Sequence, residues 1–313
     1  MLSNEQKYIE HNDEQFDLID LIKVLWGGKY LIVVVTFLFA IGSVTYSLMQ
    51  PNIYKSEALL SPVVESGGLK LPSQLGSLAA MAGVSLGGSS GSKTDFAIEL
   101  LKSRDFVSRF IEENELKVPV LAATGWDLAT NTLVLDDEVY DKSAEKWVRK
   151  VELPFAPEPS VQEVYTVFKD SYSVVKDKTT GMVSISIEHY SPYLAQQWLL
   201  KLITTINEEM RQRDLNEAKQ SIDYLNQQLS KTHLAEMKTL LHTLVQEQIQ
   251  IITLANVRSE YTFRMIDKPI VAEEKIKPKR AIIAMVGTVS GFLFGVLFVF
   301  FRYVLINRRS KKI

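Results

Sequence analysis

The stretch Gly87–Thr94 ("GGSSGSKT") comes closer than any other segment of the chain to a motif that carries chemistry. The phosphate-binding P-loop has the pattern G-x-x-x-x-G-K-[ST], and Ser92 stands where its second glycine is needed. The apolar "TLVLDDE" at 132–138 resembles the strand ending in Asp that often accompanies a P-loop. However, serine lacks the backbone freedom that lets successive amides wrap a phosphate. We therefore interpret the stretch as a Gly/Ser linker in which Ser92 and Asp95 form a capping box for the next helix.

The other residue types that could do chemistry are not arranged for it. Of the four histidines, His233 and His242 lie about two and a half helical turns apart, which is too far for one metal ion; the other two are His11 and His189. Most acidic pairs are sequence neighbours, which do not face each other on a helix. The chain has no cysteine and no G-x-S-x-G. The sequence predicts a protein that is not an enzyme, with no catalytic residues, no cofactor and no metal.

Two uncharged apolar runs, at 30–48 and 281–301, dominate the hydropathy pattern. As a helix, the second run is about 31 Å long, close to the hydrocarbon thickness of a bilayer. A buried core helix is the alternative, but uninterrupted runs of this length favour membrane spans. A cleaved signal peptide at the first run is disfavoured, because a long polar-to-mixed segment precedes it and no small-x-small site follows. We predict transmembrane helices over 30–48 and 281–301.

Charge near the two runs predicts their orientation. Lys23 and Lys29 precede the first run, and the tail beyond the second is basic, which favours cytoplasmic termini at 1–29 and 302–313. The cations just before the second run oppose this orientation, although they end a long segment that largely escapes the charge rule. Residues 49–280 then form one domain outside the cytoplasm. The net charge of −2 argues against a nucleic-acid partner.

The exported segment mixes strands and helices. A strand is expected in "NIYKSEALLSPVV" (52–64), a short helix near "SLAAMAG", and one helix over 92–116. Ser160 and Glu163 predict a capping box, and "SYSVVKDKTTGMVSISIEH" predicts a hairpin. A last strand at 260–267 could return to pair with the first. The fold class is therefore an α+β membrane protein, with two transmembrane helices flanking an α/β base.

A helix over about 192–256 is the longest predicted element. Ser191 suits its N-cap and Pro192 its first position, and neither Gly nor Pro occurs from Tyr193 to Lys268. If continuous it would be about 95 Å long, so its apolar stripe needs a partner chain or a second helix along it. A break near Ser230–His233 and two ordinary helices in a monomeric core stay open as alternatives. Homo-oligomer contacts are expected at Ile222, Leu225 and Leu229.

Two segments near the second span look functional. Gly287, Gly291 and Gly295 form a doubled G-x-x-x-G, which predicts a face for close helix packing in lipid, although glycine is common in membrane helices. The membrane-proximal segment "DKPIVAEEKIKPKR" is stiffened by its prolines and carries cations at headgroup level. It either contacts an anionic lipid-linked substrate or partner enzyme, or simply anchors the chain. Its candidate site residues are Pro269, Pro278, Lys277, Lys279 and Arg280.

Several stretches of the sequence resemble those of a known protein family. The residues that carry the resemblance are "FDLIDLIKVLWGGKYLI", "NIYKSEALLSP", "LPSQLGSLAAMAGVSLGG", "DFAIELLKSRDF", "AEMKTLLHTLVQEQIQIITLANVRSEYTFRMID" and "KPIVAEEKIKPKR". Together these segments cover nearly the whole chain. The resemblance depends on their combination, because no single segment would be enough to identify a family. The chain resembles the bacterial polysaccharide co-polymerases, specifically the O-antigen chain-length determinants of the Wzz type.

The resemblance implies an inner-membrane protein with a periplasmic α/β base and a long protruding helix. It also implies a homo-oligomer that acts with the O-antigen polymerase on lipid-linked polysaccharide and sets the modal length of lipopolysaccharide O-antigen. Co-polymerases for enterobacterial common antigen, capsule or exopolysaccharide are close alternatives, and a two-span export adaptor is a more distant one. Some relatives in this family carry a fused kinase domain. Because the last residue of this chain is Ile313, we expect no kinase domain here.

Overall fold

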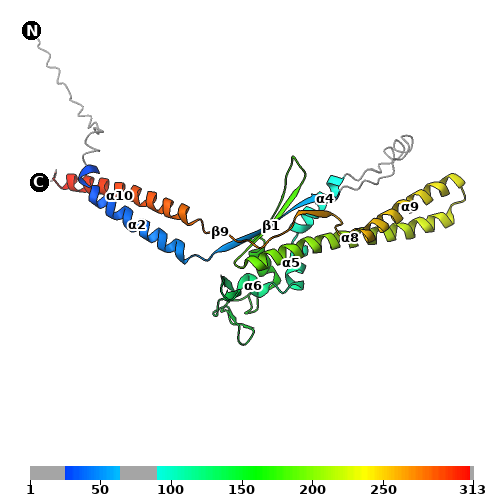
Figure 1. Cartoon of the computed structure of the whole chain (residues 1–313), viewed down its shortest axis with the longest axis horizontal. Coiled ribbons are helices and arrows are strands. Elements are labelled where there is room, and N and C mark those ends of the chain that lie inside the picture. The colour runs from blue at the N-terminus through cyan, green and yellow to red at the C-terminus, as the bar shows by residue number, and fades with distance from the viewer. Residues whose placement is uncertain (1–24, 64–89, 311–313) are drawn as a thin grey trace, which may run out of the picture. The chain divides into compact units, whose positions relative to one another are not determined.

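The computed structural model describes residues 25–63 and 90–310 of the protein (Figure 1). Two compact units make up the chain: Met1–Gln50 with Pro278–Ile313, and Pro51–Lys277. The predicted short helix near "SLAAMAG", the histidine His11 and most of the linker before Ser90 lie outside the described residues.

The first unit is a pair of apolar helices, α2 (Lys29–Met49) and α10 (Arg280–Ser310). Both are long and apolar enough to cross a membrane, and few of their residues are buried. A core helix of a soluble protein would be mostly buried, whereas these helices expose apolar side chains such as Phe37 and Leu297. The two helices lie where the predicted spans lie, and α10 continues past the predicted end at 301 into the basic tail.

The second unit is built on an antiparallel sheet in which β1 (Ile53–Pro62) is central. One side of β1 pairs with β7 (Val183–His189), which in turn pairs with β6 (Tyr172–Lys176). The other side pairs with β8 (Phe263–Asp267) and, at the start of β1, with β9 (Lys275–Lys277). The predicted first strand, the hairpin and the returning strand are confirmed.

The core of this unit lies between the sheet and α8 (Pro192–Lys231). Alternate residues of β1 and β7 are buried, with Ala58 opposite Ile185 and Leu60 opposite Val183. The helix α8 buries residues at helical spacing against them: Ala195, Trp198, Leu199, Leu202, Ile203, Ile206 and Met210. Ser191 accepts a hydrogen bond from the Leu194 N–H, which confirms the predicted N-cap.

Four shorter helices complete the unit: α4 (Ser90–Lys102), α5 (Arg104–Glu113), α6 (Lys117–Leu121) and α7 (Val161–Phe168). Two small hairpins join α6 to α7, one of β2 (Ala123–Asp127) with β3 (Thr132–Leu135), the other of β4 (Tyr140–Asp141) with β5 (Lys146–Trp147).

Local capping decides where two of these helices begin. The predicted capping box of Ser160 and Glu163 at α7 is confirmed. The single helix expected over 92–116 is wrong, because the Ser103 side chain accepts a hydrogen bond from the Phe106 N–H and starts a separate helix, α5. The helix α4 already begins at Ser90, so Ser92 lies inside its first turn and the capping box predicted there is also wrong.

The expected long helix divides into α8 and α9 (Ala235–Val257). Thr232 and Leu234 have extended backbone angles, and the chain reverses there so that α9 lies along α8 (Figure 1). At 1.5 Å per residue α8 is about 60 Å long, so the element is a helical hairpin rather than a 95 Å rod. The second helix that the apolar stripe of the predicted long helix requires is therefore α9 of the same chain.

Candidate functional site

The lysine of the P-loop-like stretch has a structural partner. The Lys93 ammonium on α4 lies 3.1 Å from the Asp214 carboxylate on α8. The same carboxylate accepts a hydrogen bond from the Tyr261 hydroxyl at 2.7 Å, and Thr94 is buried. These contacts tie α4 and the segment before β8 to α8, which is consistent with the interpretation that Lys93 is not a phosphate ligand.

His189 at the end of β7 is held in place by the backbone on both sides. Its Nε2 lies 3.0 Å from the Pro119 carbonyl oxygen, and its Nδ1 accepts a hydrogen bond from the Ser191 N–H at 3.0 Å. Burial lowers the pKa of His189, and the two backbone hydrogen bonds only partly oppose that effect. The side chain is therefore a neutral, fixed ring. Among residues 25–63 and 90–310, no group of three His, Cys, Asp or Glu side chains is placed to hold a metal ion.

The glycine row on α10 lies where the chain passes closest to α2. A Cβ atom built on Gly287 would lie 2.3 Å from the Ser43 Cβ, and one on Gly291 would lie 2.5 Å from the Phe39 Cβ. At Gly295 the nearest atom is the Ile32 Cα, at 3.1 Å. Any side chain at the first two positions would push the helices apart. The row therefore faces a helix of the same chain, and its importance for function stays a prediction.

The membrane-proximal segment is fixed to the sheet and to α8. Pro269 is buried, and its carbonyl accepts a hydrogen bond from the Gln196 amide at 3.4 Å. The next carbonyl, that of Ile270, accepts from the Ser56 hydroxyl at 2.8 Å. Lys277 forms an ion pair with Glu188 of β7. Lys279, in contrast, is exposed.

The remaining predicted site residues lie in different parts of the structure and do not form one site. Pro278 is buried, and Arg280 begins α10. The three predicted oligomer contacts on α8 are half-buried within the single chain; these residues are Ile222, Leu225 and Leu229. Tyr224, which lies between them in the sequence, is 62% exposed. Contact with a second copy of the chain stays a prediction at these positions.

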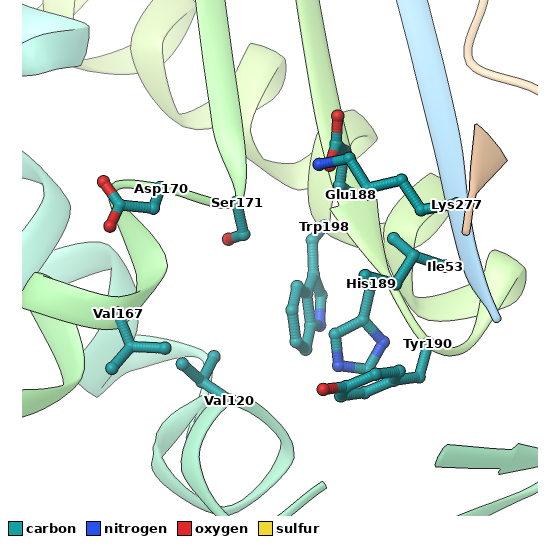
Figure 2. A pocket seen from close by; sticks show the side chains of 10 residues that line it. All are labelled: Ile53, Val120, Val167, Asp170, Ser171, Glu188, His189, Tyr190, Trp198 and Lys277. Carbon is teal, nitrogen blue, oxygen red and sulfur yellow. The ribbon is translucent and has the colours of Figure 1, made fainter. Parts of the chain in front are cut away.

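A pocket of about 230 Å³ lies at the start of β1 and the end of β7 (Figure 2). One wall is aromatic and is formed by His189, Tyr190 and Trp198. Polar groups and two valines surround the rest, and the lining residues outside the aromatic wall are Ile53, Val120, Val167, Asp170, Ser171, Glu188 and Lys277. Sequence reasoning missed this pocket, because its residues come from seven separate parts of the chain and show no common spacing.

The chain matches two protein families. The first is described as chain length determinant protein (Wzz) and matches residues 14–114. The second is described as G-rich domain on putative tyrosine kinase (GNVR) and matches residues 228–304. The chain therefore carries, at residues 14–114, the domain of the Wzz chain length determinant proteins. Its two matched segments contain the two candidate membrane helices, the first strand of the sheet, α9 and the membrane-proximal segment.

A structure described as a full-length bacterial polysaccharide co-polymerase aligns with 93% of this chain and 99% of its own length, at 12% identity and a TM-score of 0.40. A fragment of WzzB, a polysaccharide co-polymerase from Salmonella Typhimurium, aligns with 72% of this chain and 100% of its own, at 12% identity and a TM-score of 0.32. No curated protein matches the chain.

Proposed function

We propose that this protein regulates the chain length of lipopolysaccharide O-antigen as a non-catalytic polysaccharide co-polymerase. The observation that carries the proposal is the match of residues 14–114 to the chain length determinant family. The arrangement of the chain supports it, since two candidate membrane helices bracket a domain with a long helical hairpin. The protein sets the modal number of repeat units that a membrane polymerase adds to a lipid-linked polysaccharide.

The proposal includes a place in the cell. The protein lies in the inner membrane with both termini in the cytoplasm, and residues 49–280 form a periplasmic domain. Because the chain has no cysteine, single cysteines report topology without background. A cysteine in place of exposed Lys142 should react with a membrane-impermeant maleimide in intact spheroplasts, and one in place of Arg308 should react only after lysis. The reverse pattern would contradict this orientation.

Homo-oligomers of the chain are part of the proposed mechanism. The helical hairpin is the element that we assign to length control, because it is the longest structure of the domain and extends from the sheet (Figure 1). Exchange of residues 192–257 with the same segment of a relative that produces a different modal length tests this role. We expect the lipopolysaccharide ladder to shift toward the donor's length. An unchanged ladder in every exchange would refute the role of the hairpin.

One observation favours a second substrate. Residues 228–304 match a domain described as occurring on putative tyrosine kinases. In the family that the sequence resembles, relatives with a fused kinase handle capsule or exopolysaccharide. If capsule or exopolysaccharide is the substrate, deletion of the gene should alter the size of that polymer and leave the O-antigen ladder unchanged. Size-exclusion chromatography of the secreted polymer distinguishes the two candidates.

A further inference from the structure

The pocket at the end of β7 has a rigid aromatic wall. The ring centroids of His189 and Trp198 are 4.6 Å apart with the planes inclined by 57°, and those of His189 and Tyr190 are 5.8 Å apart with the planes inclined by 63°, so the three rings form an angled aromatic wall (Figure 2). Backbone hydrogen bonds hold both nitrogens of His189, and Trp198 is only 4% exposed. Ring faces that are fixed in this way offer an apolar, electron-rich surface to the C–H face of a ligand.

Three polar groups of the pocket have no partner among the described residues. They are the indole N–H of Trp198, the hydroxyl of Tyr190 and the carboxylate of Asp170. The Trp198 side chain is buried as a whole, but its N–H is not among the buried polar atoms that lack a partner, so it is open to a ligand or to water. A ligand with several hydroxyl groups would supply an acceptor to the indole N–H and to the tyrosine hydroxyl.

Charge decides which class of ligand the pocket suits. Lys277 is the lining cation, and Glu188 already neutralises it through an ion pair. His189 is neutral, so Asp170 leaves the lining with a net negative charge. An anionic group such as a phosphate or a lipid headgroup would be repelled, whereas a neutral polyhydroxylated ring would not.

The size of the pocket limits the ligand further. Its volume of about 230 Å³ is below the roughly 300–1,000 Å³ of clefts that hold drug-sized molecules. One sugar ring suits such a space better than an oligosaccharide does. Two lining residues, Ile53 and Lys277, are also the ends of β1 and β9 that lie nearest in sequence to the candidate membrane helices.

We propose that this pocket binds a single neutral sugar residue, with its apolar face against the aromatic wall and its hydroxyls on the Trp198 indole N–H and the Tyr190 hydroxyl. This proposal rests on the proposed function, which makes the sugar a part of the lipid-linked polysaccharide. The pocket gives the protein a direct contact with the polymer whose length it regulates, on the part of the domain that joins the membrane helices in sequence.

Saturation-transfer NMR on the full-length protein in detergent micelles tests the pocket. The probes are the methyl glycosides of glucose, galactose, mannose, N-acetylglucosamine and N-acetylgalactosamine, with inorganic phosphate as the anionic competitor. Tyr190→Phe keeps the ring and removes the hydroxyl, whereas Trp198→Phe removes the N–H and replaces the indole with a smaller phenyl ring. The matched controls are Trp147→Phe and Tyr224→Phe, which change the same residue types outside the pocket.

We expect at least one glycoside to give a saturation-transfer signal with the wild type and both controls. Tyr190→Phe should weaken that binding about fivefold to tenfold, since one hydrogen bond is lost, and Trp198→Phe should weaken it at least as much, since it also loses ring surface. If Trp198→Phe fails to fold, the half-buried Tyr190→Phe carries the test. No signal from any glycoside, equal signals in pocket variants and controls, or displacement of the glycoside by phosphate would each overturn the proposal.

The test of the sugar pocket and the test of the proposed function can fail independently of each other. Loss of chain-length control on gene deletion, together with no glycoside binding, would leave the regulator standing and remove the pocket. Glycoside binding that depends on Trp198 and Tyr190, together with an unchanged polysaccharide on gene deletion, would keep the pocket and remove the regulator.

Discussion

The protein contains two long helix pairs that are adapted to different surroundings. In the pair α2–α10 the outward side chains are large and apolar, as at Phe37 and Phe292. In the hairpin α8–α9 many outward side chains are polar, and apolar ones such as Tyr224 are interspersed among them. The first surface suits lipid and the second suits water, so the outward residues rather than the pairing itself identify the solvent.

The two pairs are also held together by different means. Glycines let α10 approach α2 until any added Cβ would overlap it, because lipid offers no hydrophobic drive between helices. The water-facing hairpin is instead anchored to the sheet by a core at the base of α8, where one buried amide joins this helix to Thr262 and to β8. Asn207 donates to the Phe263 carbonyl at 2.9 Å and accepts from the N–H groups of Thr262 and Phe263 at 2.9 and 2.8 Å.

The largest expected effect is therefore at the base of the hairpin. Asn207→Leu would leave two backbone N–H groups and one carbonyl buried without partners, which should lower the free energy of unfolding by about 3–5 kcal/mol. Asn226→Leu changes the same residue type at an exposed position of α8 and should cost less than about 0.5 kcal/mol. Urea unfolding followed by circular dichroism measures both. Equal stabilities would show that the amide does not hold the hairpin to the sheet.

A side chain in the glycine row should have the next largest effect. Gly291→Leu should force α10 away from Phe39 and cost about 1–3 kcal/mol through overpacking. Gly42→Leu places the same side chain on α2, where a Cβ has nothing within 4 Å, and should be nearly neutral. Titration with sodium dodecyl sulfate, followed by circular dichroism, compares the two. If both variants resist the detergent equally, close approach is not what stabilises this pair.

A pH dependence of stability is expected in the water-facing domain. The unfolded state protonates histidine below about pH 6.5, whereas burial lowers the pKa of folded His189. The unfolded state then binds more protons, so stability falls as the pH drops from 7.5 to 5.5. Carboxylates with a lowered pKa, such as Glu57, act only near and below about pH 4.5. The thermal midpoint should fall over this range in the wild type and in His242→Gln, and less in His189→Gln. The same fall in all three would exclude His189 as the cause.

The smallest effect is expected at Lys93. Its ion pair with Asp214 is partly exposed, so Lys93→Met should change the free energy of unfolding by less than about 1 kcal/mol, similar to Lys102→Met on the same helix. Equilibrium dialysis with radiolabelled ATP adds a second measurement. Saturable binding of ATP to the wild type that Lys93→Met abolishes would restore the P-loop interpretation.

Local signals in the sequence predicted much of the fold. The N-cap at Ser191, the capping box of Ser160 and Glu163, the hairpin and the returning strand depend on neighbouring residues or on alternation, and the structure confirms them. The split of the long helix was predicted only as an alternative, and the break expected near Ser230–His233 is confirmed at Thr232–Leu234. The reversal at Thr232–Leu234 contains neither Gly nor Pro, and only the second helix packed along α8 makes it favourable.

The features that depend on distant contacts could not be predicted. Nothing near Asn207 in the sequence indicates that its amide meets β8, and nothing near Trp198 indicates a pocket. The glycine row was predicted, but its partner α2 lies at the other end of the chain. The spacing of residues along a helix or strand predicts which of its faces makes contacts. Only the folded structure shows which other segment contacts that face.

The chain-length distribution of the surface polysaccharide tests the account most directly. Lipopolysaccharide from a deletion strain, and from the same strain complemented with the wild type or with Asn207→Leu, would be separated on one gel and quantified by repeat number. We predict a modal cluster of lengths with the wild type, and a broad distribution weighted to short chains both in the deletion and with Asn207→Leu. An identical modal cluster in the deletion strain and the complemented strain would contradict a role in O-antigen length control.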